Sequence, residues 1–237
     1  MKAPNGRSPS ARFLLGTKIL VFLSCLIPLA CLVRDGLADA LGANPIETII
    51  HRAGWWALAF LMIVLAVTPL RKLLGWPWLG RFRRMLGLYA FFYGTLHFLA
   101  YLVLNQFFAW REIFKDIAEH PCITVGFAAY LMMIPLAATS TDGMIRRLGG
   151  SAWRRLHKLV YIIAISGVAH FWWLVKKDIS EPAAFALILG VLLLVRVGYA
   201  INARQIPRIS WPHRESSRPK FPVDRPMPSK AAGERRR

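Results

Sequence analysis

The chain has 237 residues, 56% of them hydrophobic, and a mean hydropathy of +0.42. Soluble domains rarely have so apolar a composition, so these numbers indicate a membrane protein. A net charge of +19 would suggest nucleic-acid binding in a soluble protein. Here the basic residues lie between apolar segments, which fits loops facing anionic lipid, and we expect no nucleic-acid partner.

Six apolar segments approach the roughly 20 residues that a helix needs to cross about 30 Å of hydrocarbon. We therefore expect an all-α integral membrane protein, a six-helix transmembrane bundle. The predicted spans are 12–33, 52–70, 85–104, 121–138, 153–175 and 182–201. The first is longer than the apolar part of a signal peptide, about 7–15 residues, so we interpret it as an uncleaved helix that Pro28 bends.

The charge of the loops predicts the topology. The net charges of 34–52, 71–84, 105–120, 139–155, 176–181 and 196–237 are −1, +5, −1, +3, 0 and +8. Basic and near-neutral loops alternate, which is the positive-inside pattern for six spans with both termini in the cytoplasm. We expect a cytoplasmic N-terminus at 1–11, a transmembrane domain at 12–201, and a basic, disordered cytoplasmic tail at 202–237.

Three of the six histidines lie within predicted spans: His97 in the third, and His157 and His170 in the fifth. An ionisable side chain at membrane depth is costly, so each is a candidate functional residue. His97 follows Arg84 by 13 residues and His170 follows Arg155 by 15. At about 1.5 Å per residue both lie roughly 20 Å above the cytoplasmic face, on parallel helices in the outer half of the membrane.

Two imidazoles at equal depth can hold one haem iron from both sides. His157 lies near the cytoplasmic face, about 20 Å from His170 along the helix, which leaves room for a second redox centre. Thirteen residues leave these two side chains about 220° apart, so a bend at Ser166-Gly167 or different partner helices would be needed. The alternative is that the histidines hydrogen-bond between helices without a cofactor. Zinc is disfavoured because no cysteine or carboxylate joins them at this depth.

Other polar and aromatic residues allow two interpretations. Arg83, Arg84, Arg154 and Arg155 are topology determinants, and they are candidates to contact haem propionates, a flavin phosphate or a quinone headgroup. His51 and His120 lie at the outer interface, where simple polar contact competes with a cofactor role for His51. Candidates to line a haem pocket are Tyr89, Phe92, Tyr93, Tyr161 and Phe171, with Gly87 and Gly94 as small residues that make room.

The sequence contains no GxGxxG motif and no P-loop, and its loops are too short for an NAD(P)H site. The reductant must therefore be lipid-soluble or arrive on a separate protein.

Several motifs occur in a specific order over about 50–175. They include Ala66-Val67-Thr68-Pro69-Leu70, Arg83-Arg84-Met85-Leu86-Gly87-Leu88, Ile123-Thr124-Val125-Gly126, Pro135-Leu136-Ala137-Ala138-Thr139-Ser140, Trp153-Arg154-Arg155-Leu156-His157 and His170-Phe171. In these motifs the chain resembles the haem-binding membrane subunit of the periplasmic protein-methionine-sulfoxide reductase system, the MsrQ family. This family belongs to the ferric-reductase-like transmembrane superfamily.

The resemblance implies a multi-pass protein of the bacterial inner membrane with haem b, one or two per chain, and an association with FMN. It would carry electrons from membrane quinol, or from a flavin, to a periplasmic molybdopterin-containing subunit that reduces methionine sulfoxide in oxidised proteins. The chain would thus be an electron-transfer subunit rather than the catalytic one. His97, His157 and His170 match the family's membrane histidines as haem ligands, and Arg83 or Arg84 stands opposite His157, where the wider superfamily often has histidine. The alternatives are a self-contained ferric or cupric reductase-like cytochrome b, or a cofactor-free proton-coupled permease.

Overall fold

The computed structural model describes residues 10–175 and 178–205. The chain divides into two units, Met1–Tyr199 and Ala200–Arg237, and the helices that surround the candidate site belong to the first. Most of the predicted N-terminus, residues 1–9, and most of the predicted tail, residues 206–237, lie outside the described residues.

The described residues form helices joined by short connections and include no strand, which confirms the all-α prediction. In chain order the elements are α1 (Ala11–Leu37), α2 (Pro45–Leu73), the 3₁₀ helix η1 (Pro77–Arg81), α3 (Arg83–Ala100), the π-helical turn η2 (Tyr101–Asn105), α4 (Trp110–Glu119), α5 (Pro121–Ala138), α6 (Asp142–Leu156), α7 (Leu159–Leu174) and α8 (Ser180–Gln205). Asn44 begins α2 as an N-cap that accepts the Glu47 N–H, and Pro45 and Pro121 occupy first helical positions, where no N–H is needed.

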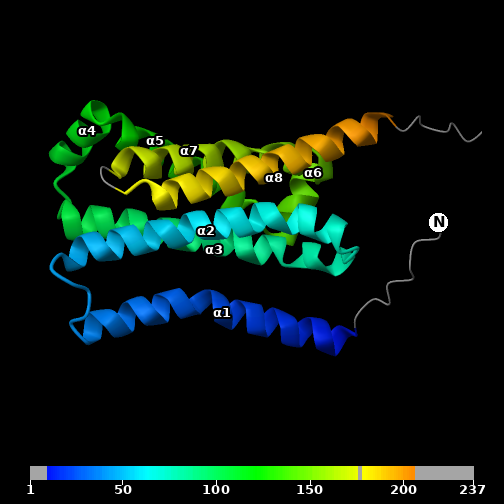
Figure 1. The fold of residues 1–237 in the computed structure, drawn as a ribbon, viewed down its shortest axis with the longest axis horizontal. Helices are drawn as coiled ribbons and strands as arrows, with labels where there is room; N and C mark the ends of the chain where they lie inside the picture. The colour runs from blue at the N-terminus through cyan, green and yellow to red at the C-terminus, as the bar shows by residue number, and fades with distance from the viewer. Residues whose placement is uncertain (1–9, 176–177, 206–237) are drawn as a thin grey trace, which may run out of the picture. The chain divides into compact units, whose positions relative to one another are not determined.

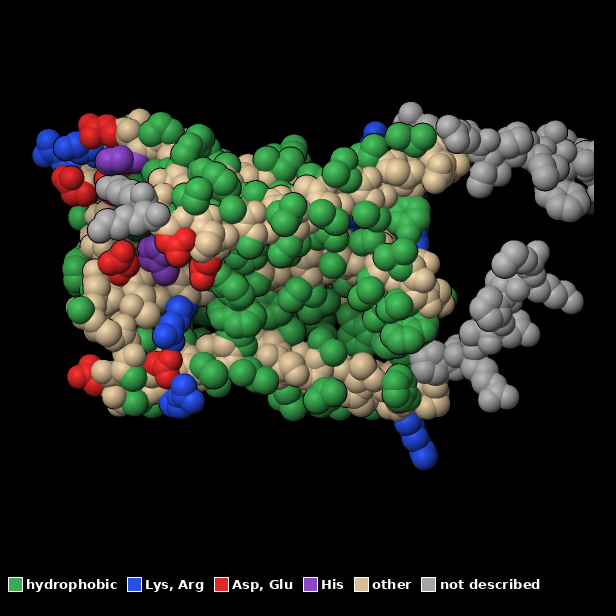
Figure 2. Space-filling model, in the orientation of Figure 1, with side chains coloured by type: hydrophobic (Ala, Val, Ile, Leu, Met, Phe, Trp, Pro, Cys, Tyr) green, Lys and Arg blue, Asp and Glu red, His purple; other side chains and the backbone are tan. Residues whose placement is uncertain are grey.

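Five helical stretches of the described chain are long and apolar enough to cross a membrane: α1, α2, Pro77–Asn105, α5 and Ser180–Asn202. The helix α7 is apolar but has only 16 residues. The chain is thus a multi-pass membrane protein, and the predicted count of six spans is not confirmed. Figure 2 shows hydrophobic side chains covering the flank of the helices, with charged side chains gathered at its ends.

The predicted helix over 153–175 is wrong as one continuous element. The helix α6 ends at Leu156 and α7 begins at Leu159. Between them the backbone tightens, because the Lys158 N–H donates to the Arg155 carbonyl, three residues back, and His157 Nδ1 lies 3.0 Å from the Trp153 carbonyl. Of the two alternatives that the sequence left open, a bend at Ser166-Gly167 is wrong, because α7 is helical throughout and the interruption lies at His157.

The helix α2 packs most extensively against α3, and α5 packs against α7 (Figure 1). The most deeply buried side chains come from these helices: Leu65 of α2, Ala90 and Tyr93 of α3, and Ile163 and Ala164 of α7. Because both α3 and α7 contact α2, this helix is buried along much of its length. The core thereby fixes α3 and α7, which carry the two outer histidines of the sequence prediction.

The helix α1 contacts α2 and α3 only sparsely, and two tyrosines of α3 bind its backbone. The Tyr93 hydroxyl donates to the Cys25 carbonyl at 2.8 Å and accepts the Leu29 N–H at 3.1 Å. In a regular helix that N–H would bond that carbonyl directly, so the hydroxyl is inserted into the ladder beside Pro28. The Tyr89 hydroxyl donates to the Phe22 carbonyl at 2.9 Å.

In α2, a second helix that contains a proline, an arginine supplies a missing backbone hydrogen bond. Pro69 of α2 has no N–H, so the Leu65 carbonyl lacks its usual partner four residues on. Arg196 Nη2 of α8 donates to this carbonyl at 2.6 Å, and Nη1 donates to the Tyr161 hydroxyl. A free carbonyl at membrane depth costs several kcal/mol, which explains an arginine within an otherwise apolar helix.

Candidate functional site

A cavity of about 720 Å³ lies between α2, α3, α5 and α7, and residues of α4 line one end of it. His97 and His170 both line it. Apolar side chains dominate the remaining wall, among them Trp55, Leu58, Leu61, Phe98, Ile113, Phe127, Met133, Ile163 and Phe171. A volume of this size suits a cofactor, since ligand pockets typically measure about 300–1,000 Å³.

The structure brings the rings of His97 and His170 together. Their centroids are 6.1 Å apart and their planes are inclined by 79°. His97 Nδ1 lies 2.9 Å from the Ile50 carbonyl of α2, and His170 Nδ1 lies 2.6 Å from the Cys122 carbonyl of α5. Since each Nδ1 donates to a carbonyl, the Nε2 atom of each ring keeps a free lone pair, which is the state that binds a metal.

A glycine on the neighbouring helix makes room for each ring. A Cβ atom on Gly54 would lie 2.9 Å from His97 Nδ1, and one on Gly126 would lie 2.6 Å from His170 Nδ1. Both glycines follow the accepting residue by four positions, Gly54 after Ile50 and Gly126 after Cys122. Each ring therefore packs over one helical turn and bonds the carbonyl exposed there.

Sequence reasoning selected different glycines. Nothing lies within 4 Å of a Cβ atom built on Gly87, while Gly94 faces Met133 at 3.6 Å and lines the cavity. The sequence placed Gly54 and Gly126 in helices next to those that carry His97 and His170. It did not reveal how these helices are rotated, and this rotation decides which side chain each glycine faces.

The residues around this cavity fit a haem held by two histidines. Two imidazoles that share one metal at about 2.0–2.1 Å place their coordinating nitrogens about 4 Å apart. Ring centroids, which lie behind those nitrogens, must be farther apart than this, as the observed 6.1 Å is. Perpendicular rings are compatible because each can rotate about its bond to the metal. Among the described residues no group of three or more His, Cys, Asp or Glu could hold a metal by itself, so a macrocycle would complete the coordination.

His157 is separate from this cavity. Its ring stacks on Trp153, with centroids 3.9 Å apart, and its Nε2 is buried without a hydrogen-bond partner among the described residues. It does not line the cavity that His97 and His170 share. An unpaired buried nitrogen is costly, so His157 is a second place where a ligand could be bound.

The four candidate arginines have different surroundings. Arg84 forms an ion pair with Asp142 at 2.6 Å, and this guanidinium holds the pKa of the Asp142 carboxyl below its ordinary value of 3.8. Arg154 lies over the backbone of Gly150, and Arg155 is exposed. Arg83 is partly buried, and no ion pair with an acidic side chain of the described residues involves it.

Arg83 has polar and charged neighbours other than an acidic partner. It lies within electrostatic range of Arg196, Tyr161 and His157. Cations held together at partial burial repel one another, so an anionic group would be attracted to this cluster.

Most of the predicted aromatic lining has other partners. Of the five aromatic candidates, only Phe171 lines the cavity. Tyr89 and Tyr93 bind the α1 backbone, Tyr161 accepts from Arg196, and Phe92 is 37% exposed. The other four candidates therefore pack or bond elsewhere, and other aromatic residues, among them Trp55, Phe98, Phe127 and Tyr130, line the cavity instead.

Residues of α4 contribute the end of the cavity nearest the start of α2. The Asp116 carboxylate accepts from the Tyr101 hydroxyl at 2.8 Å and from Gln106 Nε2 at 2.6 Å, which ties α4 to η2. The turn between them includes Phe107 and Phe108 with φ values of 47° and 59°. Bulky residues rarely adopt this left-handed conformation, so the turn is strained, and the contacts of α4 must hold it.

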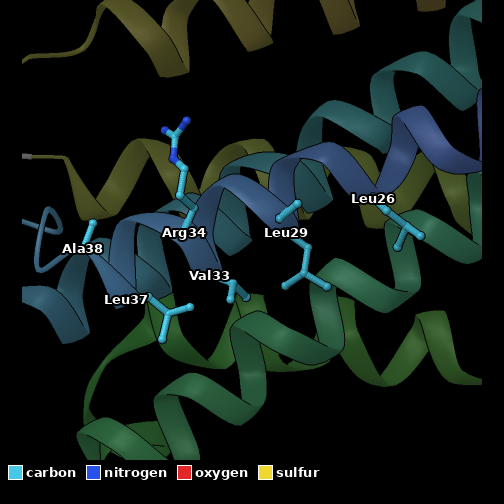
Figure 3. Close-up of a pocket in the computed structure, with 7 residues that line it drawn as sticks. Leu26, Leu29, Val33, Arg34, Leu37 and Ala38 are labelled. Atoms are coloured by element: carbon cyan, nitrogen blue, oxygen red, sulfur yellow. The ribbon is translucent and has the colours of Figure 1, made fainter.

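A second hollow, of about 710 Å³, runs along α1 (Figure 3). Its lining comes from α1 and the residue that follows it: Leu26, Leu29, Ala30, Val33, Arg34, Leu37 and Ala38. Arg34 points away from Val33 and Leu37 in Figure 3, and it bonds Asp35 at 2.8 Å. This surface is apolar and contains no histidine, so it is not the candidate site.

The fold and the paired histidines define a class of helical membrane protein with two histidines facing a largely apolar cavity inside its bundle. Residues 53–168 match the family model described as the ferric reductase like transmembrane component. The chain is 50% identical over 198 residues to the protein-methionine-sulfoxide reductase haem-binding subunit MsrQ of Herminiimonas arsenicoxydans, covering 83% of this chain and 91% of the relative.

Two further relatives bear the same name. The subunit of Xanthomonas euvesicatoria is 53% identical over 197 residues, covering 81% of this chain and 90% of the relative. The subunit of Rhodospirillum rubrum is 51% identical over 191 residues, covering 81% and 92%. The chain therefore belongs to the MsrQ family.

Proposed function

We propose that this protein is a b-type haem electron-transfer subunit of a membrane-bound methionine-sulfoxide reductase system. The names of its relatives, which describe haem-binding subunits of protein-methionine-sulfoxide reductase, support this. The observation that carries the proposal is the pair formed by His97 and His170. Their rings face a shared apolar cavity with both Nδ1 atoms bonded to backbone carbonyls.

In this proposal His97 and His170 would hold the haem iron through their Nε2 atoms, which the Nδ1 bonds to backbone carbonyls leave available. A bound haem supplies one-electron redox chemistry, with a potential set by its axial ligands and surroundings. The carbonyls of Ile50 and Cys122 keep both imidazoles in the required tautomer and orientation. The apolar wall excludes water, so the cavity favours electron transfer over reactions with solvent.

His157 and Arg83 form the second part of the proposal. An orphaned imidazole nitrogen beside a partly buried guanidinium fits a ligand that has both a coordinating or accepting atom and an anionic group. A second haem, FMN or a quinone headgroup would each meet this description. Arg84, Arg154 and Arg155 lie at the same end of the helices, where such a group would enter from the cytoplasm.

The proposed topology has six crossings of the bacterial inner membrane with both termini in the cytoplasm. The alternation of loop charge supports it, and α7 together with the end of α6 would complete the fifth crossing. Electrons would pass from membrane quinol or a flavin, across the bundle, to a periplasmic molybdopterin-containing catalytic subunit. The cavity lies near the periplasmic side in this orientation, as an exit site should.

A pyridine haemochrome assay with iron counted per purified chain tests the proposal. We expect b-type haem in the wild type, and loss of the haem between the two rings in His97→Ala and in His170→Ala. His120→Ala is the matched control because His120 lies outside the cavity. A wild type with two haems that retains one in His157→Ala would support the second site.

A colourless protein purified from haem-replete cells would refute the proposal and favour a proton-coupled permease. If the reduced haem passed its electrons to ferric or cupric ions without a periplasmic partner, the result would favour a self-contained ferric or cupric reductase. Reoxidation of the reduced haem by a periplasmic methionine-sulfoxide reductase, and not by these ions, would support the proposed partner.

A further inference from the structure

The cavity between His97 and His170 is polar at only one end. Its ionisable side chains other than these two histidines, Tyr101 and Tyr130 are Glu47, His51 and Asp116, and all three lie where α2 begins and α4 crosses. No lysine or arginine of the described residues lines it. Figure 2 shows acidic, basic and histidine side chains gathered at the end of the structure where Figure 1 places α4.

A haem has two propionate carboxylates, and an ionised carboxylate cannot be buried without a partner. The propionates must therefore lie at this polar end. Here they meet Glu47 and Asp116, which would repel them if both are ionised. The site needs a hydrogen-bond donor that can also carry positive charge.

The other polar groups at this end are largely engaged. Asp116 accepts hydrogen bonds from Tyr101 and Gln106, so the Tyr101 hydroxyl hydrogen already has an acceptor. The Asn44 amide donates to Glu47 Oε2 at 2.9 Å. His51 Nε2 is 3.8 Å from Glu47 Oε1, which is too long for a hydrogen bond, and its side chain is 48% exposed. The imidazole of His51 is thus free to turn toward a ligand.

We propose that His51 binds a propionate carboxylate of the haem held by His97 and His170, and that it is the hydrogen-bond donor to this group at that end of the cavity. The proposal rests on the proposed function. His51 acts as a positioning residue, since it contacts the rim of the cofactor and not the iron. By donating to the propionate it offsets negative charge near the iron, which favours the ferrous state.

The chain offers a closely matched control. His120 is also paired with an acidic residue four positions earlier, Asp116, at 3.7 Å, and its side chain is 55% exposed. It lies on the same side of the structure but does not line the cavity. Replacement of either histidine removes the same chemical group from a similar environment, and only His51 can reach the cofactor.

The experiment is a potentiometric titration of the purified full-length protein in nanodiscs, with the wild type, His51→Leu, His51→Arg and His120→Leu. We expect His51→Leu to keep a low-spin bis-imidazole spectrum, while its ferrous-to-ferric ratio at the wild-type midpoint falls about tenfold, equal to about 59 mV for one electron. His51→Leu should also release haem faster to an acceptor apoprotein. His51→Arg should restore both values, and His120→Leu should change neither.

Equal midpoints and equal haem release in His51→Leu and His120→Leu would overturn the inference while leaving the proposed function intact. A change of the axial-ligand spectrum in His51→Leu would also overturn it, because His51 would then act through the ligands. A wild type without haem would refute the proposed function itself and this inference with it.

Discussion

Replacement of Gly126 by alanine tests the geometry of the histidine pair most directly. The added Cβ would lie 2.6 Å from His170 Nδ1 and 2.7 Å from Cε1, whereas ordinary contact begins at 3.4 Å. The ring must therefore retreat by roughly 0.8 Å, more than the roughly 0.5 Å within which a binding constellation must be held. The retreat also lengthens and weakens the 2.6 Å bond from His170 Nδ1 to the Cys122 carbonyl.

Loss of such an outer hydrogen bond typically weakens metal binding about 10–100-fold. We expect Gly126→Ala to lose haem from the paired site by that factor, measured as the rate of haem transfer to an acceptor apoprotein. Gly54→Ala should have a smaller effect, because its Cβ lies farther away, 2.9 Å from His97 Nδ1. Gly87→Ala is the control, since nothing lies within 4 Å of its Cβ. If Gly126→Ala released haem as slowly as Gly87→Ala, the proposed packing of His170 on α5 would be refuted.

Three further predictions concern the helices and their ends. Arg196→Leu should lower the free energy of unfolding in detergent by about 1–3 kcal/mol, because the Leu65 carbonyl loses its donor. The loss should be smaller in a Pro69→Ala background, where the backbone N–H of residue 69 can bond this carbonyl. Equal losses in both backgrounds would contradict this role of Arg196. Tyr93→Phe should cost a similar amount, about 1–3 kcal/mol, because it removes the hydroxyl that joins two backbone groups of α1, and faster proteolysis of α1 would report the loss. Arg84 lowers the pKa of Asp142, so the stability from this pair is present above pH 3.8 and is lost as the pH falls through the lowered pKa. The unfolding temperatures of the wild type and of Arg84→Gln should therefore converge in acid.

The interruption at His157 shows where sequence reasoning failed. The segment 153–175 is apolar and has enough residues to cross a membrane, so hydropathy alone predicts one helix. The structure divides it because the backbone hydrogen bonds after His157 span three residues instead of four: the Lys158 N–H donates to the Arg155 carbonyl, and the Val160 N–H donates to the His157 carbonyl. This local tightening leaves hydropathy unchanged, so a hydropathy pattern cannot reveal it.

Arg196 illustrates a second limit. Its position near the end of an apolar helix was visible in the sequence, but its partner is a carbonyl 131 residues earlier, freed by Pro69. Only the packing of α8 beside α2 brings these groups together. Packing also decided the role of Tyr93, which was predicted to line a cofactor pocket. Its hydroxyl instead bridges two backbone groups of α1 by hydrogen bonds.

The sequence by itself determined the helical class, most of the helix positions and the matched depth of His97 and His170. These features follow from hydropathy and from the fixed rise per residue, which are local properties of the chain. Only the tertiary structure decided that Gly54 and Gly126 make room for the two rings, that the ring of His157 stacks on Trp153, and that His51 reaches the same cavity. Those facts depend on how each helix is rotated about its axis, and this rotation is set by contacts between residues far apart in sequence.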